Sequence, residues 1–265
     1  MSSTDVRAVG SVPTGRPTRP TAATTSVLWN LRPSATGRQL VMFPYLGGFG
    51  ASFTGLVGRL SGDWDVWTVN PPGHGPSSLP AHRRLGPLVE GYLDALREIL
   101  LPGAVFFGHS MGGIVAYHVL TAMAQRPEFR HRRPGDLVLS ACCAPCDLSI
   151  AGHAASSDQD LLRHLSGFGA IPSEVAGDPA LVAYFLPAFR ADYEVLEEAK
   201  RCPVVRLDVA TRLVLGEDDE HTPAGTASAW QDYLSRPLRT DVLPGEGHMF
   251  VRHAFEPLDA IVNDV

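Results

Sequence analysis

The feature that most constrains this chain is a Gly-x-Ser-x-Gly motif at residues 108–112, with Ser110 at its centre. Residues 104–107 before it are short and apolar, as in a buried β-strand, and residues 113–120 after it are typical of a helix. The two glycines allow a strand and a helix to approach closely through a sharp turn. Such a turn strains its central residue and exposes its side chain at the carboxyl edge of a sheet. The motif therefore predicts an accessible, reactive Ser110 hydroxyl.

Strand-like and helix-like segments alternate along most of the chain. We expect strands at 26–31, 39–43, 64–69, 104–107, 136–141, 211–215 and 239–243. We expect helices at 85–100, 113–120, 223–234 and 249–262, and a shorter one ending near residue 60. This alternation predicts an α/β fold with a mostly parallel central sheet and helices on both faces. The 265 residues suffice for one such domain, and no repeat or second core is visible.

The alternation stops between about residues 146 and 202. Only helical pieces are expected there, at 160–165 and 179–189, and glycine and proline interrupt them. A helical insertion at this point predicts a lid. Residues 1–25 are rich in Ser, Thr, Pro, Gly and Arg, a composition that predicts a disordered tail. The folded domain is therefore expected to cover residues 26–265.

Composition narrows the class of partner. The formal net charge is −6, which argues against a nucleic-acid surface, and no apolar run approaches membrane-spanning length. Cys142, Cys143, Cys146 and Cys202 do not follow a zinc spacing. We interpret them as reduced thiols of a cytoplasmic protein with no metal and no cofactor, and a metal site at the first three is the alternative.

A serine hydroxyl becomes a strong nucleophile only when a base takes its proton, and that base is usually a histidine oriented by a carboxylate. In a sheet of this kind the carboxylate and the histidine follow the serine in that order. Asp219 lies in an acidic loop after the strand expected at 211–215, before a Thr-Pro helix start, and Asp218 is the alternative. His248 lies in the loop between the last strand and the last helix. The other histidines occupy less suitable positions, and His109, inside the motif, is assigned a structural role.

A negatively charged tetrahedral intermediate needs fixed hydrogen-bond donors. One expected donor is the backbone N–H of Met111, the residue after the serine. The second is expected in the glycine-rich loop after the strand at 39–43. Leu46 is preferred there, and Gly47 is the alternative.

Taken together, these segments resemble the type II thioesterases that accompany polyketide and nonribosomal peptide synthases. The similarity covers about residues 26–260. It includes the Phe-Pro-Tyr-Leu-Gly-Gly loop at 43–48, the Asn-Pro-Pro-Gly-His-Gly turn at 70–75 and the serine motif. It also includes the segments at 140–145, 216–219 and 243–250. The chain departs from the family pattern at Leu46, where a smaller residue is usual, and at the cysteine pair 142–143.

The resemblance implies an α/β-hydrolase fold and removal of acyl groups from the phosphopantetheine arm of acyl or peptidyl carrier proteins. Carried over by residue, Ser110, Asp219 and His248 would form the catalytic triad. We also expect a substrate-binding surface in the oxyanion loop and lid, made by Tyr45, Leu162, Phe168 and Phe185. Leu165 and Phe189 are further lid candidates.

Three rival functions use the same residues differently. A carboxylesterase would cleave oxygen esters, and an acyltransferase would pass the acyl group to an amine or alcohol. A catalytically inactive hydrolase fold could instead serve as a binding module, although the complete Ser, Asp and His set argues against it.

Overall fold

The chain folds around a single seven-stranded sheet. The structure, a computed structural model, describes residues 26–150, 152–167, 169–171, 177–222 and 225–265. The predicted tail at 1–25 lies outside these residues. The strands run in the order β1-β3-β2-β4-β5-β6-β7, with β1 antiparallel to β3 and every other pair parallel. Their bounds are β1 Leu28–Arg32, β2 Gln39–Phe43, β3 Asp65–Val69, β4 Val105–His109, β5 Asp136–Ser140, β6 Ala210–Gly216 and β7 Arg239–Leu243.

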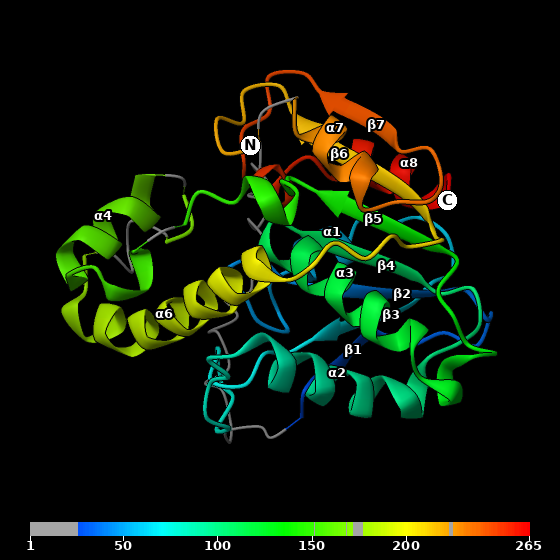
Figure 1. Cartoon of the computed structure of the whole chain (residues 1–265), viewed down its shortest axis with the longest axis horizontal. Helices are drawn as coiled ribbons and strands as arrows, with labels where there is room; N and C mark the ends of the chain where they lie inside the picture. The colour runs from blue at the N-terminus through cyan, green and yellow to red at the C-terminus, as the bar shows by residue number, and fades with distance from the viewer. Residues whose placement is uncertain (1–25, 151, 168, 172–176, 223–224) are drawn as a thin grey trace, which may run out of the picture.

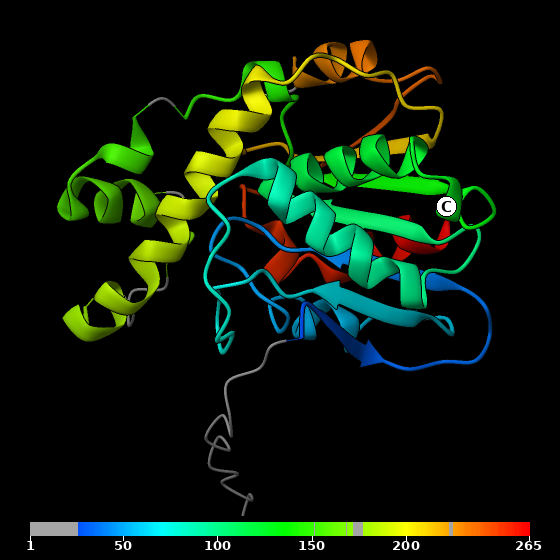
Figure 2. The ribbon, with the colours of Figure 1, turned by 60° about the horizontal axis from the view of Figure 1, so that its bottom comes forward.

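Both faces of the sheet are covered by helices, so its strands are apolar on both sides. Alternate residues of β2 enter different cores, with Val41 on one side and Leu40 on the other. Helices α2 (Leu85–Ile99), α3 (Met111–Ala124) and α7 (Thr226–Asp232) share the first core. Helices α1 (Thr54–Val57) and α8 (Phe255–Asn263) share the second (Figures 1 and 2). This is the predicted α/β architecture.

The segment between β5 and β6 forms a helical insertion without strands in its described residues. It contains the short 3₁₀ helices η2 (Pro145–Asp147) and η3 (His153–Ala155), then α4 (Asp158–Gly167) and α6 (Pro179–Arg201). Figure 1 shows α4 and the outer half of α6 projecting beyond the sheet, while the inner half of α6 returns to it. This insertion matches the predicted lid in position and in helical character.

One helix of the lid and one segment at the C-terminus differ from the bounds expected from the sequence. The helix expected at 179–189 continues to Arg201, although Pro187 lies inside it. Its start is strong because the Asp178 side chain accepts hydrogen bonds from the N–H groups of Ala180 and Leu181.

The helix expected at 249–262 is in fact two, η4 (Phe250–Arg252) and α8. Pro257 lies in the first turn of α8, where its missing N–H costs nothing, so a helix start near Phe255 is favoured. Among the described residues, none of the helices has the length and apolar character needed to cross a bilayer.

Candidate active site

Ser110 lies at the turn between β4 and α3 in a backbone conformation that few residues adopt. Its φ is 54° and its ψ is −122°. A Cβ on Gly108 would overlap the backbone of Gly113, and one on Gly112 would overlap the carbonyl of Phe43. Both motif glycines are therefore required by close backbone packing, as the sequence predicted. The strain is held by the surrounding sheet and places the hydroxyl at its carboxyl edge.

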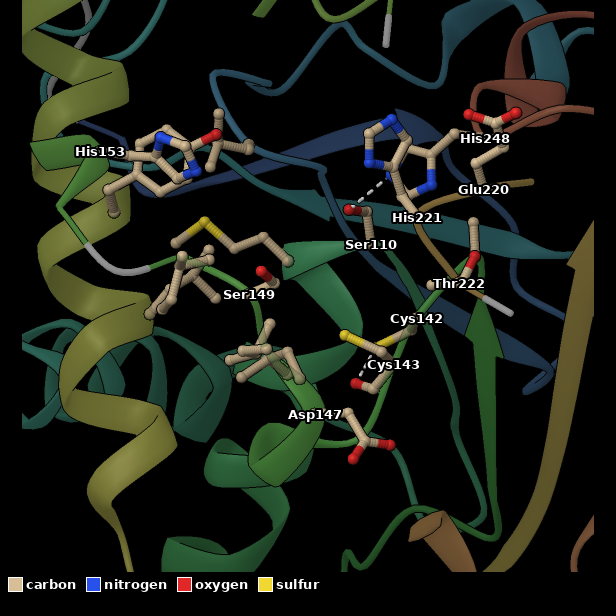
Figure 3. Close-up of a pocket in the computed structure, with 18 of the residues that line it drawn as sticks. Ser110, Cys142, Cys143, Asp147, Ser149, His153, Glu220, His221, Thr222 and His248 are labelled. Atoms are coloured by element: carbon tan, nitrogen blue, oxygen red, sulfur yellow. Dashed lines mark hydrogen bonds between the residues drawn. The ribbon is translucent and has the colours of Figure 1, made fainter. Parts of the chain in front are cut away.

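A hydrogen-bonded chain of three side chains joins Ser110 to two later loops. His248 Nε2 lies 2.9 Å from Ser110 Oγ, and His248 Nδ1 lies 2.9 Å from Asp219 Oδ2 (Figure 3 shows the first contact). Asp219 comes from the loop after β6 and His248 from the loop after β7. Because a carboxylate only accepts, His248 carries its proton on Nδ1 and offers Nε2 to the serine. The three residues predicted from sequence are thus brought together.

Asp219, and not Asp218, occupies the buried position beside His248. Asp219 is 5% exposed, whereas Asp218 is exposed. The Asp219 carboxylate also accepts from the N–H groups of His221 and Thr222 at 2.9 and 3.2 Å, and from the Thr222 hydroxyl. Burial alone would raise the pKa of Asp219, but the hydrogen bond and charge of His248, with those further donors, lower it to about 2. Asp219 therefore stays ionised at neutral pH.

The two residues expected to donate to an oxyanion lie beside the serine. Leu46 and Met111 both line the cavity that contains Ser110. The N–H of Gly47, the alternative donor, is instead directed at the Asp192 carboxylate, 2.7 Å away. This engagement favours Leu46 over Gly47, and the roles of Leu46 and Met111 stay predictions.

A cavity of about 390 Å³ opens beside Ser110 and extends to the lid. Its wall combines apolar side chains with imidazole, hydroxyl, carboxyl and thiol groups. Figure 3 shows His153 across the cavity from Ser110 and His248. The lining residues are Leu46, Ser110, Met111, Ile114, Ala141, Cys142, Cys143, Asp147, Leu148, Ser149, Ile150, His153, His164, Tyr193, Leu196, Glu220, His221, Thr222 and His248.

The residues predicted to contact substrate lie elsewhere or are not described. Leu162 and Phe185 pack against the first core, and Tyr45 lies against Phe53, His109 and Arg252. None of these three lines the cavity. Phe168 lies outside the described residues. Substrate contact by these four residues stays a prediction.

The lid contributes a polar cluster that the sequence reasoning missed. The rings of His153 and His164 stack with centroids 3.9 Å apart, and His164 Nε2 lies 2.9 Å from the Tyr193 hydroxyl. Burial, with the nearby His153 and His221, lowers the pKa of His164 to about 4. The His164 ring is therefore neutral at pH 7, and this end of the cavity presents hydrogen-bonding groups. His164 lies on α4 and Tyr193 on α6, so their positions in the sequence do not predict that they meet.

His109 has the structural position that the sequence predicted. It is fully buried, and its Nδ1 lies 2.9 Å from the Ser140 hydroxyl. Burial, with the nearby His248, holds the pKa of His109 well below its ordinary value, so the ring is neutral. It packs against His248, with ring centroids 5.8 Å apart, and supports the loop that carries His248.

The four cysteines are free thiols. Cys142 and Cys143 line the cavity, and burial raises the pKa of Cys143 to about 12. A thiol with so high a pKa is protonated and a weak nucleophile at neutral pH. Among the described residues, no group of His, Cys, Asp and Glu side chains is arranged to hold a metal ion.

Comparisons with known proteins identify the family of the chain. Residues 38–265 match the family model described as Thioesterase domain. A probable cadicidin biosynthesis thioesterase of Streptomyces griseus is 28% identical over 92% of this chain and 67% of its own length. Two further relatives, named as a synthetase and a synthase, match over only 12% and 16% of their length.

Solved structures share the whole architecture. RedJ, a thioesterase from the prodiginine pathway of Streptomyces coelicolor, superposes with a TM-score of 0.79 at 28% identity, over 93% of this chain and 97% of RedJ. YbtT, the type II thioesterase of the yersiniabactin pathway, gives 0.77 at 26% identity, over 90% and 97%. The family model covers most of the chain, and these two structures match at least 90% of it. The chain therefore belongs to the Thioesterase domain family and has its α/β-hydrolase fold.

Proposed function

We propose that this protein is a serine hydrolase that cleaves acyl thioesters from the phosphopantetheine arm of acyl or peptidyl carrier proteins. The observation that carries the proposal is the hydrogen-bonded set Ser110–His248–Asp219. Ser110 and His248 of this set line a cavity of about 390 Å³. A buried, ionised carboxylate, an oriented imidazole and a strained serine are the parts that nucleophilic acyl transfer needs.

In the first half of the reaction Ser110 Oγ attacks the thioester carbonyl while His248 Nε2 takes the hydroxyl proton. Asp219 stabilises the imidazolium that forms. The tetrahedral oxyanion lies between the N–H groups of Met111 and Leu46, and each such donor contributes about 3–4 kcal/mol to the transition state. The carbon–sulfur bond then breaks, the proton on His248 passes to the pantetheine thiolate, and an acyl-Ser110 ester remains.

In the second half a water molecule replaces the thiol. His248 Nε2 takes a proton from the water as its oxygen attacks the acyl-Ser110 carbonyl. The second tetrahedral intermediate collapses, the proton returns to Ser110 Oγ, and the free carboxylic acid leaves. The enzyme is regenerated and the net reaction consumes one water per thioester.

The relatives support a carrier-bound substrate. YbtT is described as a type II thioesterase of a mixed nonribosomal peptide and polyketide pathway, and RedJ as a thioesterase of prodiginine biosynthesis. We therefore infer that this chain serves a pathway of the same kind, and that its own substrates are acyl or aminoacyl groups that block a carrier arm, in an editing role.

The test is hydrolysis of a panel of acyl-carrier proteins by the wild type and by Ser110→Ala. Release of free carrier thiol by the wild type, and its loss in Ser110→Ala, supports the proposal. Faster cleavage of simple oxygen esters than of carrier thioesters would favour a carboxylesterase. Acyl transfer to an added amine or alcohol in preference to water would favour an acyltransferase. Failure of a fluorophosphonate to label Ser110 would favour a binding module.

A further inference from the structure

The lid helix α6 contacts the loop that carries the candidate oxyanion donor Leu46. This loop follows β2, and its Tyr45–Gly48 turn is closed by a 2.7 Å hydrogen bond from the Gly48 N–H to the Tyr45 carbonyl. Gly47, the third residue of the turn, has a φ of 73°, which is the signature of a type II turn. The Gly47 N–H belongs to the Leu46–Gly47 peptide plane. This plane is joined through the Leu46 Cα to the Tyr45–Leu46 plane, which carries the Leu46 N–H, so restraint of one plane limits the orientation of the other.

Asp192 on α6 holds the Leu46–Gly47 peptide plane through a hydrogen bond with the Gly47 N–H. Its Oδ2 accepts the Gly47 N–H at 2.7 Å, and Asp192 as a residue is 5% exposed. The ring of Phe189, one helical turn earlier, packs directly on Gly47, where a Cβ would overlap it. Asp192 also shares a small cavity of about 20 Å³ with Tyr45, Met111 and Gly112. Asp192 and Phe189 of the lid helix thus contact the loop, and neither lines the catalytic cavity.

The Asp192 carboxylate is in turn fixed by His74 of the turn after β3. His74 Nε2 lies 3.0 Å from the same Oδ2, and His74 Nδ1 lies 3.0 Å from the Pro72 carbonyl. A carbonyl and a carboxylate both only accept, so both ring nitrogens carry protons and the pair is an imidazolium with a carboxylate. Burial lowers the pKa of His74, but the charge and hydrogen bond of Asp192 outweigh it and raise that pKa above its ordinary value.

A buried pair of this kind has a high cost if either partner is lost, because the other charge is then left uncompensated. Neither residue lines the catalytic cavity, so the pair does not contact substrate there. The pair is linked to the oxyanion loop by the hydrogen bond from the Gly47 N–H, next to the candidate donor.

We propose that Asp192 and His74 are positioning residues that set the orientation of the oxyanion loop. Through them the lid helix keeps the Leu46 N–H directed toward the oxyanion that forms beside Ser110. The inference rests on the proposed function, since an oxyanion hole has meaning only for an acyl-transfer enzyme. It adds that the lid is part of the catalytic geometry and not only a cover over the acyl group. Displacement of α6 by even about 1 Å would misplace the donor, an error that typically costs on the order of 100-fold in rate.

The experiment compares Asp192→Ala, Asp192→Asn and the wild type with a propionyl-carrier substrate. We expect Asp192→Ala to lower kcat about 10- to 100-fold with KM nearly unchanged, because the donor acts mainly in the transition state. Affinity for a trifluoromethyl ketone, which forms a tetrahedral oxyanion on Ser110, should fall by a similar factor. Affinity for a non-hydrolysable amide analogue of the substrate should not change. Asp192→Asn retains an acceptor for the Gly47 N–H without the charge and should be intermediate.

Glu194→Ala is the matched control. Glu194 lies on the same helix and pairs with Arg83 at 2.5 Å, at an exposed site away from the oxyanion loop. Its loss should leave kcat and the ketone affinity unchanged. A folded Asp192→Ala variant with wild-type kcat and ketone affinity would overturn the inference. If Asp192→Ala does not fold, an Asp192→Asn variant with wild-type values for both would overturn it.

Failure of the proposed function gives a different result. In that case the wild type itself would not hydrolyse the carrier thioester, whatever the behaviour of the variants.

Discussion

His248 Nδ1 lies 2.9 Å from Asp219 Oδ2, and this contact determines which nitrogen of the histidine is available to Ser110. With the proton on Nδ1, Nε2 is left as the acceptor for the serine hydroxyl 2.9 Å away. The buried carboxylate therefore sets the tautomer and, in the proposed mechanism, the direction of proton transfer.

Replacement of this carboxylate should abolish most activity. In Asp219→Asn the side-chain amide can donate to Nδ1, which favours the wrong tautomer, and we expect kcat to fall by about 10⁴-fold. Asp218→Asn is the control, since Asp218 is exposed and its backbone N–H bonds to the Glu246 carbonyl. Steady-state kinetics on an acyl-carrier substrate measure both. Equal losses in the two variants would show that the acid has been misassigned.

The same carboxylate should make stability depend on acid pH. The pKa of Asp219 is about 2 in the folded protein and about 3.9 in an unfolded chain. Because the folded value is lower, the ionised carboxylate stabilises the fold at pH values above about 4, and this contribution disappears as the pH falls toward 2. It amounts to the order of 2 kcal/mol. Denaturant unfolding between pH 5 and 2 should show a steeper loss for the wild type than for Asp219→Asn, and parallel curves would contradict the assignment.

The glycines of the serine turn should tolerate no side chain. Gly112→Ala would place a Cβ against the Phe43 carbonyl, a backbone atom that cannot move aside. We expect a loss of several kcal/mol in the free energy of unfolding or failure to fold. Gly91→Ala on α2 is the matched control, because its nearest neighbour would be the His82 side chain at an ordinary 3.9 Å. Ala should stabilise that helix by about 0.5–1 kcal/mol. Thermal and urea unfolding measure both, and an unaffected Gly112→Ala would refute the packing argument.

The polar wall of the cavity should limit the acyl chain. The His153 ring and the Ser149 hydroxyl line the cavity, and no described residue hydrogen-bonds to either side chain. A long alkyl chain would remove water from these groups without replacing its hydrogen bonds, at about 1–3 kcal/mol per group. We expect acetyl and propionyl carriers to react roughly 10-fold or more faster than octanoyl carriers, by kcat/KM.

Removal of that polarity should change the preference. His153→Leu should raise kcat/KM for the octanoyl carrier relative to the propionyl carrier. Arg163→Ala, which alters only an exposed ion pair on α4, should leave the ratio unchanged. If the wild type prefers octanoyl, or if His153→Leu leaves the ratio as it was, the wall does not select the substrate.

The parts of the site that the sequence predicted are those that depend on local backbone geometry. Ser110 could be placed because a glycine-flanked serine between strand and helix admits few conformations, and His248 because it follows the last strand. Asp219 needed the further observation that a Thr-Pro helix start follows it. The parallel sheet then brings these strand ends to one edge, which is why residues 138 positions apart meet.

The position of the lid could be predicted from the sequence, but the residues with which it faces the cavity could not. Its helical segments were visible, but which faces turn toward the cavity depends on long-range packing of α4 and α6. Phe189, a candidate for the acyl chamber, packs on Gly47, and His153, His164 and Tyr193 line the cavity. The continuation of α6 past Pro187 follows from burial of Leu186, Ala188 and Phe189, which outweighs one lost backbone hydrogen bond.

The central claim is that the Ser110 hydroxyl carries the acyl group, and the most direct measurement is intact-protein mass spectrometry during turnover of a propionyl-carrier substrate. The wild type should show a propionyl adduct on Ser110, with release of one free carrier thiol and one propionate per turnover. Ser110→Ala should show no adduct and a rate lower by at least about 10⁴-fold. Undiminished thioester hydrolysis by Ser110→Ala, or an adduct on another residue, would contradict it.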